Sequence, residues 1–221
     1  MVMSTVALSF DNGPDPDVTP LVLDVLARRG VKASFFVLGK NLASPERMKL
    51  AERAAAEGHR VGNHSFTHRV PLGLDPAPEA VEREIVATEQ LLGALAQNPK
   101  MFRPFGGGGK IGPHLLSPAA TAHLVSNHYT CVLWNSVPED WIDQDAWVQR
   151  AIADASARAH TLVVMHDILP RAMSHLDGFI GALLDAGHRI ADEFPAECVP
   201  IVRGEVVRDI SGFVSATRAP A

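Results

Sequence analysis

Short apolar segments alternate with longer segments of helical periodicity along most of the chain. Thr5–Phe10, Ala33–Leu38 and Thr161–His166 are apolar, short and bounded by turn residues, as buried strands are. The strand pattern of the first segment extends back to about Val2. Shorter candidate strands are His59–Asn63, Lys100–Phe105, Tyr129–Trp134 and His188–Ile190.

Capping residues and apolar periodicity predict the helices between these strands. Thr19, Ser44 and Ser117 each stand directly before a proline, which combines a capping side chain with a residue suited to the first helical turn. The predicted helices are Pro20–Arg29 stopped by Gly30, Pro45 to near Gly58, Pro78–Gln97, Pro118 to about Ser126, Asp145–Ala159 and Leu176–Ala186. After Phe194 we expect irregular chain with a frayed end at residues 215–221.

Repeated alternation of strand and helix predicts an α/β fold with a parallel sheet. An open doubly wound sheet and a closed or partly closed (β/α) barrel both fit this order. The length of 221 residues favours a short barrel, because a full eight-unit barrel takes about 250 residues. We find no internal repeat and no linker, so we expect a single domain over residues 1–221.

Composition excludes several classes of protein. Hydrophobic residues make up 47% and charged residues 20% of the chain, which is typical of a globular domain. The net charge of −5 argues against a nucleic-acid partner, and no apolar run is long enough to predict a membrane-spanning helix. The first ten residues resemble a strand rather than a signal peptide, so we expect a cytoplasmic protein.

Polar residues follow the predicted strands at the points where those strands end. In both candidate architectures these carboxyl ends share one edge of the sheet, and active sites form there. We therefore expect the scattered groups to converge on one rim. They are Asp11 and Asn12, His64 and His68, Arg103, Asp140, and His166 with Asp167.

His64 and His68 are four residues apart in the segment HSFTH. On a helical turn, side chains at that spacing share a face, so both imidazoles can reach one metal ion. Spacing alone more often marks surface or capping histidines, but the position after a strand favours a metal site. The pair Asp11–Asn12 is placed to supply a third ligand or, in Asp11, a general base.

Three further groups allow both a functional and a structural interpretation. Arg103 either anchors a buried carboxylate and holds its pKa low or is a surface arginine. His166, oriented by Asp140, either protonates a leaving amine or is a core histidine bonded to backbone groups. Gly106–Gly109 lacks a phosphate-loop pattern and predicts a mobile loop near the site.

The other candidate chemistry is weaker. No GxSxG segment is present, and neither cysteine has a catalytic context. Trp134 and Trp141 are typical of core residues, although a tryptophan on the rim can stack on a sugar or wall an acyl pocket. The histidines away from strand ends, His114 among them, are expected to be structural or surface residues.

Five segments in their order along the chain resemble the five motifs of the polysaccharide deacetylases, the carbohydrate esterase family 4 group. They are SFDNGP at 9–14, HSFTH at 64–68, FRPFG at 102–106, WNSVPEDW at 134–141 and LVVMHD at 162–167. The resemblance implies a distorted (β/α) barrel with about seven parallel strands. It also implies a metal-dependent hydrolase that removes acetyl groups from N-acetylated sugars, with zinc as the expected metal.

The resemblance also assigns roles to residues of this chain. Asp11 is similar to the family's general base and His166 to its general acid, with Arg103 positioning Asp11 and Asp140 tuning His166. The remaining implied roles are metal binding by Asn12, His64 and His68, oxyanion binding by the backbone N–H near Phe105 or Gly106, and a pocket wall at Trp141. Substrate specificity is expected in the rim loops Val70–Pro78, Gly106–Ser117 and Asp167–His175.

The sequence departs from the family pattern in two places. Asn12 stands where the family has a second aspartate, and an amide ligand without charge weakens binding of a hard dication. The third motif, Arg103-Pro104-Phe105, is one residue shorter than the family's order.

We expect hydrolysis of a carbon–nitrogen amide bond in a small N-acetylated sugar or amide. Asn12 keeps two alternatives open: a metal-independent hydrolase of small amides or imides, and a non-catalytic carbohydrate-binding relic. The retained Asp11, Arg103, Asp140 and His166 argue against the relic, because it has no need of a base and an acid with their orienting partners.

Overall fold

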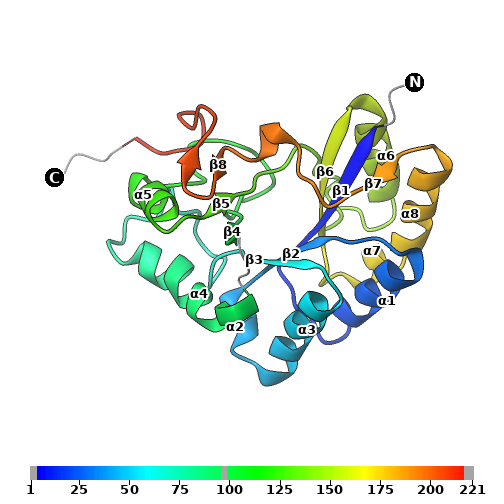
Figure 1. Cartoon of the computed structure of the whole chain (residues 1–221), viewed down its shortest axis with the longest axis horizontal. Coiled ribbons are helices and arrows are strands. Elements are labelled where there is room, and N and C mark those ends of the chain that lie inside the picture. Colours follow the sequence, from blue (N-terminus) through cyan, green and yellow to red (C-terminus); the bar gives the residue numbers. More distant parts are fainter. Residues whose placement is uncertain (1–3, 96–98, 217–221) are drawn as a thin grey trace.

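The structure is a computed structural model that describes residues 4–95 and 99–216 (Figure 1). In these residues a curved sheet has nine strands, of which seven pair in parallel. They are β1 (Thr5–Asp11), β2 (Ser34–Val37), β3 (Arg60–Asn63), β4 (Met101–Phe102), β5 (Thr130–Cys131), β6 (His160–His166) and β7 (Arg189–Ile190). The predictions for Val2 and Met3, for the helix end at Gln97 and for residues 217–221 lie outside the described residues.

The strands follow one another in the order β6-β1-β2-β3-β4-β5, and β7 pairs with the first residues of β1. Between β5 and β6 the described chain has an isolated bridge, Ser136 to Val163, which brings the two ends of the curved sheet together. This confirms the predicted distorted (β/α) barrel with about seven parallel strands. The closure is partial, because the chain after β5 contributes one bridging residue rather than a strand.

The main helices agree with the predicted ones to within a few residues. They are α1 (Thr19–Arg29), α3 (Pro45–Ala56), α5 (Pro118–Ser126), α6 (Trp147–Ala157) and α8 (Leu176–Asp185). Gly30 ends α1 in the left-handed conformation at φ 65°, which glycine adopts without steric cost. Ser117 caps α5 by accepting a hydrogen bond from the Ala120 N–H at 3.1 Å.

Several predicted boundaries are wrong. Thr19 does not cap α1: it is the first helical residue, and its hydroxyl instead bonds Asp15 and Asp167. Ser44 makes no side-chain cap bond to α3. The predicted helix Pro78–Gln97 is broken into the π-helical segment η1 (Glu82–Val86), α4 (Ala87–Leu92) and the 3₁₀ turn η2 (Gly93–Leu95).

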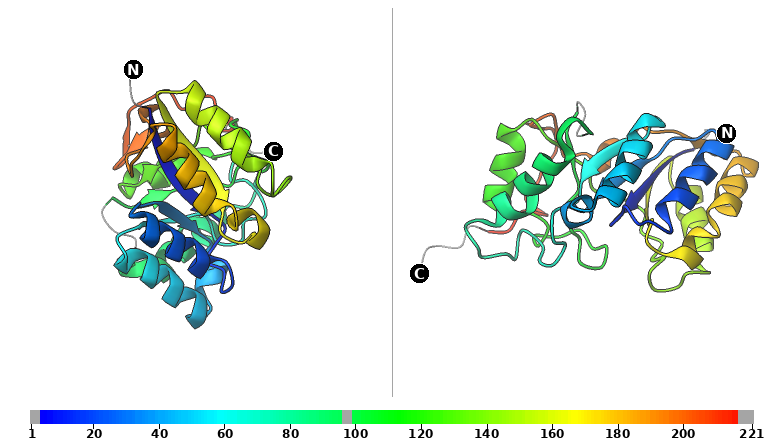
Figure 2. Two further views of the ribbon diagram at one scale, coloured as in Figure 1. Left: turned by 90° about the vertical axis from the view of Figure 1, so that its right-hand side faces the viewer. Right: turned by 90° about the horizontal axis from the view of Figure 1, so that it is seen from below.

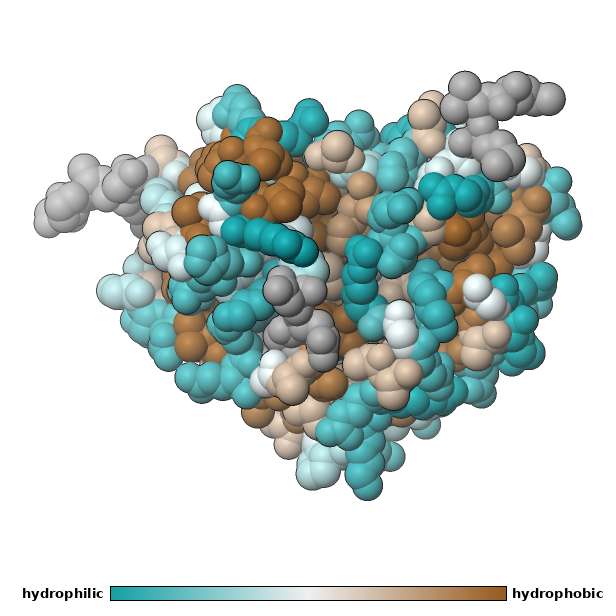
Figure 3. Space-filling model, viewed as in Figure 1, coloured by the Kyte–Doolittle hydropathy of each residue, from teal (hydrophilic) through white to brown (hydrophobic). Residues whose placement is uncertain are grey.

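Five short elements were not predicted at all. The turns α2 (Gly39–Leu42) and α7 (Pro170–Met173) follow β2 and β6. After Phe194 the chain is not wholly irregular: the 3₁₀ turn η3 (Ala196–Cys198) leads into a hairpin of β8 (Ile201–Val202) and β9 (Glu205–Val206), in which β8 pairs antiparallel with β5. Figure 3 shows apolar surface over this hairpin, where Val202, Val206 and Val207 are exposed. Two-residue strands carry too little periodicity to be recognised in a sequence.

Alternation along β1 separates the core from the site. Val6, Leu8 and Phe10 pack outward against α1, α3, α6 and α8. Ala7 packs in the barrel interior, and the same inward face continues through Ser9 to Asp11. An apolar strand thus carries a carboxylate into the interior at its carboxyl end.

The loops that follow the strands gather on one side of the sheet (Figure 2, right). The connections after β3, β4 and β5 lie there together, and residues from all three line one pocket. The expected convergence of the strand ends is therefore confirmed. No helix in the described residues has the length and apolar character needed to cross a membrane.

Trp147 anchors the helical layer. It is fully buried on α6, lies edge-on to Phe179 at 5.0 Å between ring centroids, and donates its indole N–H to the Ala172 carbonyl at 3.1 Å. We expect Trp147→Ala to lower the free energy of unfolding by about 3–5 kcal/mol in urea titrations, because it removes a large buried ring and leaves a cavity. Trp141→Ala, at a rim position, is the control; equal losses in the two variants would contradict this account.

Candidate active site

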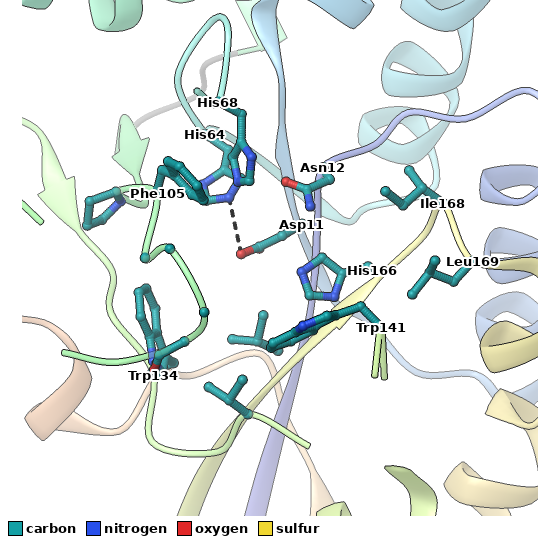
Figure 4. Close-up of a pocket in the computed structure, with 17 residues that line it drawn as sticks. Asp11, Asn12, His64, His68, Phe105, Trp134, Trp141, His166, Ile168 and Leu169 are labelled. Atoms are coloured by element: carbon teal, nitrogen blue, oxygen red, sulfur yellow. Dashed lines mark hydrogen bonds and ion pairs between the residues drawn. The ribbon is translucent and has the colours of Figure 1, made fainter. Parts of the chain in front are cut away.

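Asp11 and His166 end two neighbouring strands at the same level. Their Cα atoms are register partners in the pairing of β1 with β6, so both side chains emerge at the same edge. Figure 4 shows the Asp11 carboxylate between His64 and His166, with Asn12 beside it. Residues 155 positions apart in the sequence are therefore adjacent because parallel pairing aligns the strand ends.

Arg103 holds Asp11 from inside the barrel. Its guanidinium donates to Asp11 Oδ1 and to Ser9 Oγ, each at 2.8 Å, and stacks on Phe36 at 4.0 Å. Two further bonds go to the Val132 and Leu133 carbonyls, at 3.3 and 3.2 Å. Arg103 is 0% exposed, so the interpretation as a surface arginine is wrong.

The environment of Asp11 keeps its carboxylate ionised. Burial by itself would raise the pKa of Asp11, but the Arg103 guanidinium, with smaller effects from His64 and His166, lowers this pKa below its ordinary value. A carboxylate that stays ionised at neutral pH is able to accept a proton from water.

His166 has the opposite environment. Its Nδ1 lies 2.7 Å from Asp140 Oδ1, and its backbone N–H donates to Asp140 Oδ2 at 2.8 Å. Burial by itself would lower the pKa of His166, but the hydrogen bond and charge of Asp140 raise it above the ordinary value. Trp141 packs edge-on against the His166 ring at 5.1 Å. The interpretation as a core histidine bonded to backbone groups is therefore wrong.

His64 and His68 do not lie on a helical turn, contrary to prediction. They belong to a loop after β3 in which Ser65 and His68 have positive φ angles of 69° and 54°. The loop still brings the two rings together, 4.9 Å apart between centroids. Two side chains four residues apart can therefore lie side by side without a helix when residues with positive φ turn the backbone of the loop.

The ring of His64 has a defined orientation. Its Nδ1 lies 2.8 Å from the Arg103 carbonyl, which can only accept, so Nδ1 carries the proton. Nε2 is then free of a proton in the neutral ring and lies 3.5 Å from Asp11 Oδ2. Burial lowers the pKa of His64, and burial with the nearby His64 lowers the pKa of His68 to about 3. Neutral imidazoles are the form that binds metal ions.

Asn12 completes a donor set that fits a metal ion. Its Oδ1 is buried and has no hydrogen-bond partner among the described residues, and buried oxygens are rarely left so. Among those residues no three His, Cys, Asp or Glu side chains are grouped to hold a metal. The unpaired amide oxygen of Asn12, which lies beside Asp11 and the two histidines in Figure 4, is a candidate third donor. Two neutral imidazoles and an orphaned amide oxygen suit a divalent cation such as zinc.

A pocket of about 250 Å³ opens over these groups. Phe105 packs on the His68 ring at 3.8 Å between centroids. The pocket wall away from the ionisable groups is mostly apolar or glycine: Phe105, Gly106–Gly109, Trp134, Val137, Trp141, Val164, Ile168 and Leu169. Trp134 and Trp141 thus both line the pocket rather than the core alone.

The glycine segment 106–109 is tied at both ends. The His114 ring lies 2.9 Å from the Gly106 carbonyl, and Trp134 donates its indole N–H to the Gly109 carbonyl at 2.7 Å. His114 is therefore structural, as expected, but at the pocket rather than on a remote surface. Gly106 leaves no space for a Cβ against Trp134, 2.7 Å away, so the backbone itself forms this wall. The oxyanion role of the N–H near Phe105 or Gly106 stays a prediction.

Two buried carboxyl groups near the site make contacts to which the sequence analysis assigned no role: Asp167, which was expected only at the rim, and Glu84, which was not among the candidates. Asp167 accepts a hydrogen bond from Thr19 at 2.5 Å and fills the space beside Gly13. Glu84 hydrogen-bonds the loop that carries His64 and His68. A signal for Glu84 existed: it falls among Val81, Ile85 and Thr88 on the buried stripe of the predicted helix, where a charged residue is rare.

Asp167 makes the stability of the protein depend on pH. Burial raises the pKa of Asp167 from 3.8 to about 7. Between these values the unfolded chain loses this proton and the folded chain keeps it, so the free energy of unfolding falls as pH rises through the window. In urea titrations between pH 5 and 7, we expect the free energy of unfolding of wild type to fall by up to about 1.4 kcal/mol per pH unit relative to that of Asp167→Asn. Parallel pH profiles for the two proteins would contradict this assignment.

Comparisons with known proteins find similar sequences and structures. The family model for polysaccharide deacetylase matches residues 3–116. Peptidoglycan-N-acetylglucosamine deacetylase PgdA of Listeria monocytogenes is 31% identical over 199 residues, covering 89% of this chain and 40% of that protein. This chain therefore spans less than half the length of that relative.

Two other relatives are matched over most of their length. A chitooligosaccharide deacetylase of Rhizobium leguminosarum bv. trifolii is 37% identical over 169 residues, which cover 75% of this chain and 72% of that protein. The structure of a family 4 acetyl xylan esterase from Clostridium thermocellum, in complex with a cobalt ion, superposes with a TM-score of 0.68. It is 27% identical, and the match covers 85% of this chain and 87% of that one.

Proposed function

Because this chain belongs to the polysaccharide deacetylase family, we propose that it hydrolyses the N-acetyl amide bond of an amino-sugar oligosaccharide or polymer. The observation that carries the proposal is the pairing of Asp11 with Arg103 and of His166 with Asp140 on adjacent strand ends. One pair favours an ionised base and the other a protonated acid within one pocket. The relatives named as deacetylases of peptidoglycan and chitooligosaccharide support this substrate class.

Asp11 is the proposed base of the first step. Arg103 fixes Asp11 Oδ1, and the lowered pKa keeps the carboxylate free to take a proton from the attacking water. The acetyl group is proposed to lie against the apolar wall at Trp141 and Leu169, with its carbonyl oxygen toward the N–H groups near Phe105 and Gly106. Such donors stabilise the negative charge that develops on that oxygen.

His166 is the proposed acid of the second step. Asp140 holds its Nδ1 and stabilises the protonated ring, so Nε2 carries a proton toward the pocket. Transfer of that proton to the amide nitrogen releases the sugar amine and leaves acetate.

Asn12, His64 and His68 are the residues proposed to hold a divalent cation, for which zinc is our first choice. When bound, the cation supplies Lewis-acid polarisation of the acetyl carbonyl and of the attacking water. The cobalt ion named in the esterase structure supports a metal site in this fold. An amide in place of a carboxylate leaves the site more positive, which predicts weaker metal binding than an aspartate would give.

The experiment that tests this function measures acetate release from N-acetylglucosamine oligomers, together with bound zinc by elemental analysis. We expect near-stoichiometric zinc and turnover in wild type, loss of zinc in His64→Ala, and a fall in kcat of at least about 10²-fold in Asp11→Asn and His166→Ala. Circular dichroism and the melting temperature serve as the controls for folding.

Three outcomes would overturn the proposal in different ways. Turnover of small cyclic amides or imides that survives chelation, without turnover of sugars, favours the metal-independent hydrolase. Binding of the oligomers without acetate release, with or without added zinc, favours the non-catalytic relic. Full activity in Asp11→Asn or His166→Ala rejects the assignment of base or acid.

The pH profile tests the pairing of Asp140 with His166. Because the Asp140 carboxylate raises the pKa of His166, its removal leaves burial as the dominant influence and lowers that pKa. We expect Asp140→Asn to move the alkaline limb of kcat/KM to lower pH, in addition to lowering its maximum. An alkaline limb at the wild-type pH would show that His166 is not the group that must be protonated.

A further inference from the structure

The loop that carries His64 and His68, residues 64–68, has a backbone that needs outside support. Ser65 and His68 adopt positive φ angles of 69° and 54° without being glycine. Such conformations are disfavoured for residues with a Cβ and persist where surrounding contacts enforce them. We call residues 64–68 the histidine loop.

Glu84 supplies much of this support from one side. Its Oε2 accepts hydrogen bonds from the Phe66 and Thr67 N–H groups at 3.1 and 2.8 Å, and its Oε1 accepts one from the Thr67 hydroxyl at 2.8 Å. Glu84 is 3% exposed, so these bonds are shielded from water. One carboxylate thereby satisfies two consecutive backbone donors of the histidine loop.

The turn α2 holds the carbonyl groups of the same loop from the other side. The Gly39 N–H donates to the Ser65 carbonyl at 3.0 Å, and the Lys40 N–H donates to the Phe66 carbonyl at 3.1 Å. Gly39 leaves no space for a Cβ against the Phe66 ring. The histidine loop is thus bonded to both α2 and Glu84, and its Phe66 and Thr67 N–H groups depend on Glu84.

The position of Glu84 is itself determined by η1. Asn63 donates its side-chain N–H to the Ile85 carbonyl at 2.9 Å and accepts from the Ser65 N–H at 2.9 Å, which ties η1 to the start of the histidine loop. Thr88 donates to the Glu84 carbonyl at 3.2 Å. π-helical turns are rare in proteins as a whole, but those that do occur often lie at functional sites. This one directs Glu84 at the loop.

We propose that Glu84 is a positioning residue that holds the histidine loop in the conformation that presents His64 and His68 together at the pocket. It acts through the loop backbone and touches neither substrate nor metal. The part of the proposal that concerns metal affinity rests on the proposed function, whereas the holding of the loop does not. Arg83 bonds Glu84 Oε1 at 3.0 Å from the more exposed side and leaves Oε2 to the loop.

Substitutions at Glu84 separate a geometric role from a role of its charge. Gln keeps the length and one acceptor oxygen for the backbone donors but loses the charge, while Asp keeps the charge but is one methylene too short. A geometric role predicts that zinc affinity falls in the order wild type, Glu84→Gln, Glu84→Asp, Glu84→Ala. A direct electrostatic effect of the carboxylate on the cation instead predicts a higher zinc affinity in Glu84→Asp than in Glu84→Gln.

Zinc affinity is measured by competition with a chromophoric chelator. We expect Glu84→Ala to weaken it by about 10–100-fold, the usual effect of removing a group that orients metal ligands, and Glu84→Gln by less than about threefold. Glu82→Gln, at an exposed position on the same η1 segment, is the matched control and should equal wild type. If Glu84→Ala does not fold, the comparison of Glu84→Asp with Glu84→Gln decides the question.

Amide hydrogen exchange of the metal-free protein tests the loop independently of any metal. The Phe66 and Thr67 amides should be protected in wild type and exchange at least about tenfold faster in Glu84→Asp and Glu84→Ala. If wild type binds no zinc, the proposed metal site is wrong, and the role of Glu84 is then tested by the amide exchange rates alone. Either of two results would overturn the inference. One is exchange of both amides at the wild-type rate in a folded Glu84→Ala variant. The other is a higher zinc affinity in Glu84→Asp than in Glu84→Gln.

Discussion

The buried ion pair between Arg103 and Asp11 is the interaction on which the rest of the site depends. Removing two charges from water costs several kcal/mol per ion, and the attraction offsets this only when the remaining hydrogen-bonding groups are satisfied. Arg103 meets that condition through Ser9 and the Val132 and Leu133 carbonyls, which join β1 to the chain after β5. Its own carbonyl then orients His64. The barrel interior is therefore polar where it meets the pocket and apolar beneath it.

The site separates similar groups by their surroundings. Asp11 and Asp140 are both buried aspartates, but Asp11 faces an arginine and Asp140 faces a histidine. His64 is buried and His166 is half-buried, and only His166 has a carboxylate within hydrogen-bond distance of its Nδ1. These differences lower the pKa of His64 and raise that of His166. One pocket thus combines a carboxylate whose surroundings favour its ionised form, an imidazole whose surroundings favour its neutral form and another whose surroundings favour its protonated form, the combination that the proposed reaction requires.

The histidine loop shows why part of the site could not be predicted. HSFTH has the spacing of a helical turn, and the sequence contains no glycine to announce the left-handed residues at Ser65 and His68. Their conformation is enforced by Glu84 and α2. Glu84 is distant in sequence from the loop, and α2 is too short to have a periodic pattern. The β8–β9 hairpin was missed for a related reason, since two-residue strands form only against a neighbour.

The order of the main strands and helices, the parallel sheet, and the strand ends at which Asp11, Arg103 and His166 stand could all be predicted from the amino-acid sequence. Apolar periodicity and turn residues are local properties, and parallel pairing then brings strand ends to one edge. The partners of those groups and the extent of their burial could be seen only in the folded chain. Burial and hydrogen bonding depend on chain segments far apart in sequence, and these contacts set the pKa of each group and the orientation of each ring.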